Sequence, residues 1–304
     1  MVSSSVARAH RALTRLAAAA ALSLAMATNV HAALAYSNMF IFGDSLSETG
    51  NYQALGVGAL AYPGVSAPGR HSNGPVWVEY LGAQLGIGVD AWLSGGNNYA
   101  WGGARTEGQP GPFPPIDVGV QATIFLNEYE SGADSDALYV VWGGGNDARD
   151  GLVANTADNL GQIIAALASV GARHFLVPNL PDVGPDFAQV NSDLVPVLDS
   201  LEATLPISLT RLDVASLFAA VIGDTVLNGG GVYGFSNVVD PCYDGSSVCA
   251  TPDSYLLWDE IHPTTRMHEV IGNAAFAALT PVPVPAAVFL LTPSLLLLGR
   301  RRAA

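Results

Sequence analysis

Two segments near opposite ends of the chain carry residue types that can perform nucleophilic catalysis. Segment 43–51, GDSLSETGN, places Ser45 directly after a short apolar run. Segment 258–264, WDEIHPT, places Asp259 three residues before His262. A carboxylate on the same loop as a histidine can hold the imidazole in one tautomer, which leaves the other ring nitrogen free to accept a proton from a serine. These are the residue types that serine-based acyl transfer requires.

Each of these residues also has a structural or alternative interpretation. Ser45 or Ser47 could serve only as the cap of a helix after the strand, and the segment by itself leaves this open. A lone histidine is more often structural than catalytic. Only His262 combines a nearby acid with a following proline among the four histidines of the central region, which are His71, His174, His262 and His268. A metal-dependent hydrolase with Asp259 and His262 as ligands would need a third ligand, and none lies close in sequence.

Two glycine-rich segments could stabilise a negatively charged oxygen. They are 97–104, NNYAWGGA, and 143–147, GGGND. Glycine lets the backbone approach a reacting oxygen, and the side-chain amide of Asn146 can donate a hydrogen bond to it. Such residues are also common in turns. Residues 229–234 match G-x-G-x-x-G, but no strand is predicted before them and no helix after them, so we do not interpret them as a dinucleotide site.

The segments that must position these residues alternate between strand-like and helix-like patterns. The expected strands are 39–43, 138–142, 174–178 and 207–214, and the expected helices are 152–170 and 266–279. A strand, a helix and a strand in succession indicate a βαβ crossover and therefore a parallel sheet covered on both faces. In such sheets ligands bind beyond the carboxyl ends of the strands, where the polar segments fall. Residues 53–75 and 223–256 are rich in Gly, Pro, Ser and Asn, and we expect them to form long loops.

Both ends of the chain are apolar and carry arginines. Residues 1–32 have the order of a secretory signal peptide, with cleavage expected after Ala32 or, as the alternative, after Ala35. Residues 281–304 combine prolines, an apolar run and a final arginine cluster, which predicts a short membrane-entering helix with its arginines on the cytoplasmic side. We expect a single α/β domain at 33–280, export across the inner membrane, and transient anchoring by the tail.

Charge and cysteine content restrict the function further. All 12 basic residues are arginines; the two ends hold six, which leaves six against 26 acidic residues, a net charge of −20 for 33–280. Such a domain should not bind nucleic acid. Without lysine, a P-loop lysine, a Schiff base and a Ser–Lys dyad are excluded. Cys242 and Cys249 are expected to pair in an exported protein and to stiffen the loop before His262, because a redox or metal site would need further ligands.

Four motifs occur in the order and rough spacing of the SGNH (GDSL) hydrolases: GDSLSETGN, NYAWGGA, GGGND and DEIHPT. The chain resembles this family from about Met39 to His268. The resemblance implies a three-layer α/β/α sandwich of flavodoxin-like type with a central, mostly parallel sheet. It implies Ser45 as nucleophile, His262 as base and Asp259 as the residue that orients it. The implied oxyanion hole consists of Ser45, Gly103 and Asn146, or has Gly102 in place of Gly103 if the second motif is shifted by one. No metal and no organic cofactor are implied.

Segment 70–82, RHSNGPVWVEYLG, is similar to the lipase/esterase branch that includes phospholipase-like haemolysins. We therefore expect an exported ester hydrolase that acts through an acyl-enzyme on lipid or short acyl esters. The alternatives are an O-acetyl esterase acting on exopolysaccharide and a non-catalytic matrix-binding protein on the same fold; the five intact site positions argue against the second. The chain departs from this branch between Pro181 and Pro206, so the resemblance does not describe the roof of the pocket.

The C-terminal sequence VPVPAAVFLLTPSLLLLGRRRAA resembles the PEP-CTERM sorting signal of exopolysaccharide-producing bacteria, with Val284 where that signal usually has an acidic residue. The resemblance implies a sorting protease as a partner, an exopolysaccharide matrix as a further partner, and a final location in the cell envelope or extracellular matrix. The alternative is a tail that stays uncleaved as an anchor.

Overall fold

The structure is a computed structural model that describes residues 36–62, 65–107 and 116–280. The predicted signal peptide at 1–32 and the predicted sorting tail at 281–304 lie outside the described residues. Within the described ranges, no helix has the length and apolar character needed to cross a membrane.

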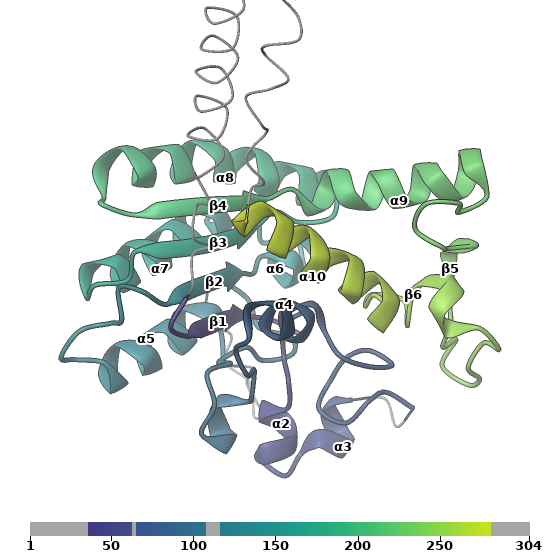
Figure 1. Ribbon diagram of the computed structural model, residues 1–304, viewed down its shortest axis with the longest axis horizontal. Helices are drawn as coiled ribbons and strands as arrows, with labels where there is room; N and C mark the ends of the chain where they lie inside the picture. Colours follow the sequence, from purple (N-terminus) through teal and green to yellow (C-terminus); the bar gives the residue numbers. More distant parts are fainter. Residues whose placement is uncertain (1–35, 63–64, 108–115, 281–304) are drawn as a thin grey trace, which may run out of the picture. The chain divides into compact units, whose positions relative to one another are not determined.

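A four-stranded parallel sheet forms the centre of the described domain (Figure 1). Its strands lie in sequence order: β1 (Met39–Gly43), β2 (Leu138–Trp142), β3 (His174–Pro178) and β4 (Ser208–Leu212). The first three have the bounds expected from their apolar runs, and the fourth is shorter than expected. Gly43 pairs with Trp142, so β1 and β2 end side by side and the segments that follow them meet at one edge of the sheet.

Helices cover both faces of the sheet, which gives the predicted three-layer α/β/α fold (Figure 1). The helices of one face are α4 (Trp77–Leu85), α9 (Val214–Asn228) and α10 (Thr265–Leu279), and those of the other are α5 (Val118–Glu128), α7 (Thr156–Ser169) and α8 (Pro185–Thr204). Successive strand side chains point to opposite faces. Accordingly, Met39 and Ile41 join one hydrophobic core, and Phe40 and Phe42 join the other.

Several elements were not expected from the sequence. Besides α4, α5, α8 and α9, they are α2 (Asn51–Ala54), α3 (Gly58–Ala61), α6 (Gly145–Arg149), η1 (Trp92–Ser94), η2 (Pro252–Ser254), β5 (Asn237–Pro241) and β6 (Tyr255–Leu257). We predicted that 53–75 and 223–256 form long loops. This is only partly right, because both stretches contain short helices or strands. Helix α8 was not predicted because its apolar stripe is narrow. It buries only Val190, Leu194 and Leu198 along 20 residues.

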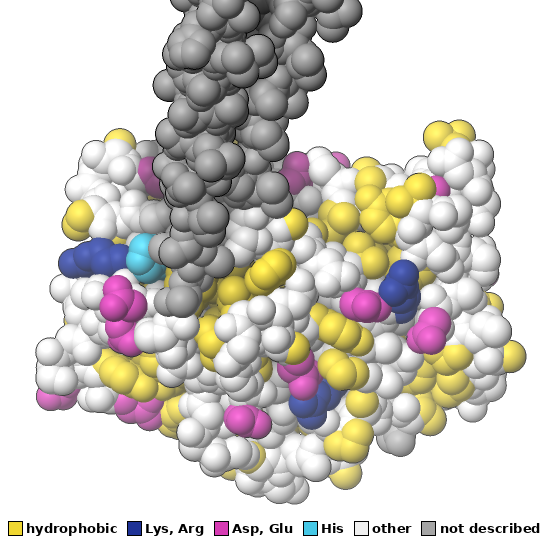
Figure 2. Space-filling view, in the orientation of Figure 1, with side chains coloured by type: hydrophobic (Ala, Val, Ile, Leu, Met, Phe, Trp, Pro, Cys, Tyr) yellow, Lys and Arg dark blue, Asp and Glu magenta, His cyan; other side chains and the backbone are white. Residues whose placement is uncertain are grey.

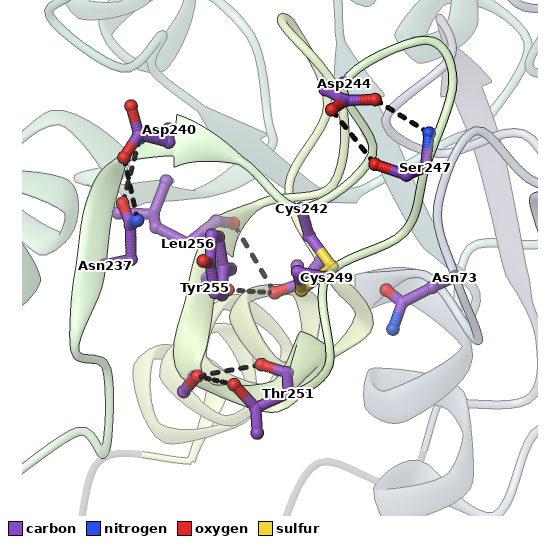
Figure 3. The surroundings of a disulfide bond; sticks show 12 residues. Asn73, Asn237, Asp240, Cys242, Asp244, Ser247, Cys249, Thr251, Tyr255 and Leu256 are labelled. Atoms are coloured by element: carbon purple, nitrogen blue, oxygen red, sulfur yellow. Dashed lines mark hydrogen bonds between the residues drawn. A yellow bond between two sulfur atoms is a disulfide. The ribbon is translucent and has the colours of Figure 1, made fainter.

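Cys242 and Cys249 form the predicted disulfide (Figure 3). The loop that it closes is attached to the end of β6, because the N–H of Cys242 donates to the carbonyl of Leu257 at 2.9 Å and that of Tyr243 donates to the carbonyl of Trp258 at 2.6 Å. The crosslinked loop therefore lies directly beside the backbone that leads into Asp259.

Candidate active site

Ser45 lies in a single tight turn directly after β1. The N–H groups of Ser47 and Glu48 both donate to the carbonyl of Asp44 at 3.0 Å. The sequence left open that Ser45 or Ser47 only caps a helix after the strand, but the next helix, α2, starts at Asn51 and has only four residues. A long helix dipole is therefore not available at Ser45. The strand before it comes very close to β2, because a Cβ on Gly43 would lie 2.6 Å from a backbone oxygen.

A hydrogen-bonded line joins Ser45, His262 and Asp259. The Nε2 of His262 lies 2.9 Å from the Oγ of Ser45, and its Nδ1 lies 2.8 and 3.0 Å from the two carboxylate oxygens of Asp259. One of these oxygens also accepts the N–H of Ile261 at 2.9 Å and that of His262 at 2.8 Å. The carboxylate is thus locked on the histidine loop. In this arrangement Nδ1 carries the proton and Nε2 can accept one from the serine.

The local environment keeps the histidine neutral and the aspartate charged. Burial lowers the pKa of His262, and although the hydrogen bond to Asp259 opposes this effect, the pKa remains below its usual value. Burial acts to raise the pKa of Asp259, but the hydrogen bond and charge of His262 and the loop N–H groups outweigh it, so this pKa is lowered. At neutral pH the imidazole can therefore act as a base beside an ionised carboxylate.

The oxyanion hole implied by the sequence consists of three N–H donors. The backbone N–H groups of Ser45 and Gly103 donate to no acceptor among the described residues. Asn146 lines the same pocket as Ser45, and its Nδ2 donates one hydrogen to the carbonyl of Ala104 at 2.8 Å, which leaves its second hydrogen for another acceptor. The N–H of Gly102, the alternative considered from the sequence, is already bound to a carboxylate oxygen of Glu48 at 2.7 Å. The hydrogen bonding therefore favours Gly103 over Gly102.

A pocket of about 450 Å³ opens beside Ser45 and Asn146. Most of its wall is apolar and consists of Leu46, Trp142, Leu180, Pro181, Val183, Phe187, Phe218, Leu257, Ile261 and Pro263. Three charged side chains also line it: Asp44, Arg149 and Glu260. Burial, together with the charge of Asp147, raises the pKa of Asp44 to about 6. The pocket can hold an apolar group next to the serine hydroxyl.

Much of the apolar wall is not revealed by the sequence. Leu46, Ile261 and Pro263 belong to the two motifs that carry Ser45 and His262, but the other residues come from the end of β2, from the segment before and within α8, from α9 and from the end of β6, and no short motif connects these segments. The stretch between Pro181 and Pro206, for which the resemblance gave no description, supplies Pro181, Val183 and Phe187. Among the residues that the structure describes, no group of three or more His, Cys, Asp or Glu side chains is arranged to hold a metal ion.

Comparisons with known proteins identify a family and several relatives. The family model described as GDSL-like Lipase/Acylhydrolase matches residues 39–275. An uncharacterised protein from the trpE-trpG intergenic region of Pseudomonas putida is 29% identical over 316 residues, covering 86% of this chain and 51% of that protein. Lipase 1 of Photorhabdus luminescens is 32% identical over 174 residues, covering 54% of this chain and 25% of that protein. The thermolabile hemolysin of Vibrio parahaemolyticus is 26% identical, covering 76% and 61%. The chain thus spans between a quarter and about three fifths of the length of these relatives.

Solved structures are similar at lower identity. A member of the lipolytic protein G-D-S-L family from Veillonella parvula has a TM-score of 0.45 and 17% identity, and the match covers 81% of this chain and 99% of that one. The lipase/acylhydrolase from Enterococcus faecalis has a TM-score of 0.42 and 15% identity, with 79% and 93% covered.

Proposed function

The chain belongs to the GDSL-like lipase/acylhydrolase family, and from this membership we propose that it hydrolyses carboxylic esters through an acyl-enzyme. The observation that carries the proposal is the unbroken line of hydrogen bonds from the Oγ of Ser45 through His262 to Asp259. A serine that serves only as a helix cap does not need a buried imidazole at its hydroxyl. A non-catalytic matrix-binding protein has no use for this line either.

In the proposed reaction, the Oγ of Ser45 attacks the ester carbonyl carbon while its proton passes to the Nε2 of His262. The carbonyl oxygen becomes negatively charged and accepts hydrogen bonds from Ser45 N–H, Gly103 N–H and the Asn146 amide. When the tetrahedral intermediate collapses, the protonated imidazole gives its proton to the leaving alcohol. Water, deprotonated by the same nitrogen, then attacks the acyl-enzyme and releases the carboxylic acid. Asp259 stabilises the imidazolium both when the acyl-enzyme forms and when it is hydrolysed.

The lining of the pocket supports esters with an apolar acyl part. Hydrophobic walls around a few placed polar groups are typical of small-molecule sites, and an acyl chain would remove this apolar surface from water. Arg149 and Glu260 bring opposite charges to the pocket, so it has no strong preference for an anion. Acidic side chains are spread over the face of the domain seen in Figure 2, and with a net charge of −20 they favour neutral or zwitterionic esters. The names of two relatives, a lipase and a hemolysin, point to lipid esters.

O-acetyl groups of an exopolysaccharide are the second candidate substrate, because the C-terminal sequence resembles a matrix-associated sorting signal. A panel of chromogenic esters of increasing acyl length, tested beside an acetylated polysaccharide, separates the candidates. We expect the purified exported protein to reach its highest kcat/KM on an acyl chain longer than acetyl. Cleavage restricted to acetyl esters would favour the polysaccharide, and no cleavage of any ester would contradict the hydrolase and favour a matrix-binding protein.

We also propose that the protein is exported and that its tail is removed by a sorting protease. The order of residues 1–32 and 281–304 supports this, and a disulfide between Cys242 and Cys249 suits an oxidising compartment. In a host that carries the sorting protease, the intact mass of the mature, matrix-associated protein should correspond to a chain that ends after Thr280 but before the arginine cluster. A mature protein with the full tail would refute removal and favour a permanent anchor.

A further inference from the structure

Gly102 is held at both of its backbone polar atoms by side chains from the segment after β1. A carboxylate oxygen of Glu48 accepts its N–H at 2.7 Å, and the hydroxyl of Tyr52 donates to its carbonyl oxygen at 2.9 Å. The two side chains are themselves linked, because the backbone N–H of Tyr52 donates to the other oxygen of Glu48 at 3.0 Å. Glu48 is fully buried. Gly102 is therefore clamped between two residues that lie four positions apart.

The clamp acts on Gly103 through the peptide bond. The carbonyl of Gly102 and the N–H of Gly103 belong to one planar peptide unit, and in a trans peptide they point in opposite directions. A hydrogen bond that fixes the direction of the carbonyl consequently fixes the direction of the N–H. Donation to the carbonyl oxygen also polarises the peptide and strengthens the N–H as a donor.

This peptide has a second accessible orientation. Residues 101–104 form a β-turn, in which the N–H of Ala104 donates to the carbonyl of Trp101 at 3.1 Å, and Gly103 has a φ of +75°. That φ belongs to a type II turn; a type I turn has φ near −90° at the same position, and the two differ by a flip of the central peptide. With glycine at both central positions, no Cβ opposes the flip. A flipped peptide would turn the N–H of Gly103 away from the oxyanion.

From this geometry we propose that Tyr52 is a positioning residue of the oxyanion hole: its hydroxyl holds the Gly102–Gly103 peptide in the orientation that presents the N–H of Gly103 to the substrate. The inference rests on the proposed function, in which that N–H stabilises the oxyanion.

The surroundings of Tyr52 suit this task. Burial, together with the charges of Glu48 and Asp117, raises the pKa of Tyr52 to about 12, so the hydroxyl keeps its proton at neutral pH. The ring packs edge-on against Trp101, with ring centroids 4.9 Å apart. The side of Gly102 on which a Cβ would lie is closed, since that atom would be 2.2 Å from the Nε2 of His71. The hydroxyl hydrogen bond then becomes the contact that selects between the two peptide orientations.

Tyr52→Phe tests the proposal, because it removes the hydroxyl and keeps the ring. In the exported protein we expect kcat to fall about tenfold with KM nearly unchanged, less than the 10²- to 10³-fold loss that follows removal of a whole oxyanion donor. Tyr62→Phe is the matched control: the hydroxyl of Tyr62 donates to Glu48 at 2.5 Å but does not reach Gly102. This variant should keep a kcat close to that of the wild type.

A second measurement does not depend on how much of the variant folds. A boronic acid adds reversibly to the serine and places an oxygen in the oxyanion hole, so its inhibition constant should rise for Tyr52→Phe by the same factor as kcat falls. Unchanged kcat and inhibition constant in an active enzyme would overturn the role of Tyr52 and leave the proposed function standing. A lower kcat with an unchanged inhibition constant would also overturn it. A wild type without esterase activity would instead refute the proposed function.

Discussion

The Nε2 of His262 lies 2.9 Å from the Oγ of Ser45, although 217 positions separate the two residues in the chain. Hydrogen bonds between loops hold this distance. The carbonyl of His262 accepts the N–H of Trp258 at 2.7 Å, which closes the histidine loop. The hydroxyl of Ser72 donates to the carbonyl of Pro263 at 2.8 Å, which attaches the loop to the segment that precedes α4. The catalytic geometry is thus part of the folded framework and should survive substitution of single site residues.

Replacing Ser45 by alanine should abolish covalent labelling by an organophosphonate and leave the fold intact. The only hydrogen bond of this hydroxyl among the described residues is to His262, so little stability depends on it. Ser47→Ala is the control from the same motif: its hydroxyl accepts the indole N–H of Trp77 at 3.0 Å, and this variant should lose stability but keep labelling. Intact mass and thermal melting measure both effects. Labelling that survives Ser45→Ala would disprove the nucleophile.

Asn146→Ala should lower kcat by about 10² to 10³ and leave KM nearly unchanged, because the amide binds the oxygen only when charge develops on it. It should also cost about 1 kcal/mol of stability, since the carbonyl of Ala104 loses its donor. Asn159→Ala is a control, because Asn159 bonds to the neighbouring Thr106 and does not line the pocket. If Asn146 only forms a turn, its loss will lower the melting temperature while kcat per folded molecule stays normal.

For a neutral ester, the loss of kcat/KM on the acid side of the pH profile should have its midpoint below pH 6.5. A protonated imidazole cannot accept the serine proton, so activity is lost as the pH falls through the pKa of His262 in the free enzyme. Burial lowers that pKa, which moves the loss to lower pH. The charge of His71, whose ring centroid lies 4.9 Å from that of His262, acts in the same direction. His71→Phe should therefore move this midpoint to higher pH. A wild-type midpoint above pH 6.5 would contradict this environment.

Asp44→Asn should be more stable than the wild type at pH 8, and this advantage should be smaller at pH 4. The pKa of Asp44 is raised from 3.8 to about 6, so the folded state binds its proton more tightly than the unfolded state, and stability falls as the pH rises through this interval. An asparagine does not carry this penalty. Its advantage over the wild type should grow by up to about 3 kcal/mol between pH 4 and pH 8. Denaturant unfolding at both pH values measures it, and an advantage that does not change with pH would contradict a raised pKa.

Features with local causes could be predicted from the sequence. Strands β1, β2 and β3 are covered on both faces, so their residues form continuous apolar runs that can be recognised without a partner. The hydrogen bonds between His262 and Asp259 also depend only on a short loop, and the three-residue spacing indicated them. The alternation of these runs with a helical pattern was enough to predict a parallel three-layer fold.

Features that depend on contacts between distant segments could not be predicted from the sequence. Phe187 and Phe218 belong to separate helices and form one pocket wall only after α8 and α9 pack against the sheet. The choice between Gly102 and Gly103 was open in the sequence because the two glycines are adjacent and identical. Glu48 favours Gly103, because its carboxylate binds the N–H of Gly102 from 54 positions away. A hydrogen bond across such a separation exists only after the chain has folded, and local sequence patterns carry no record of it.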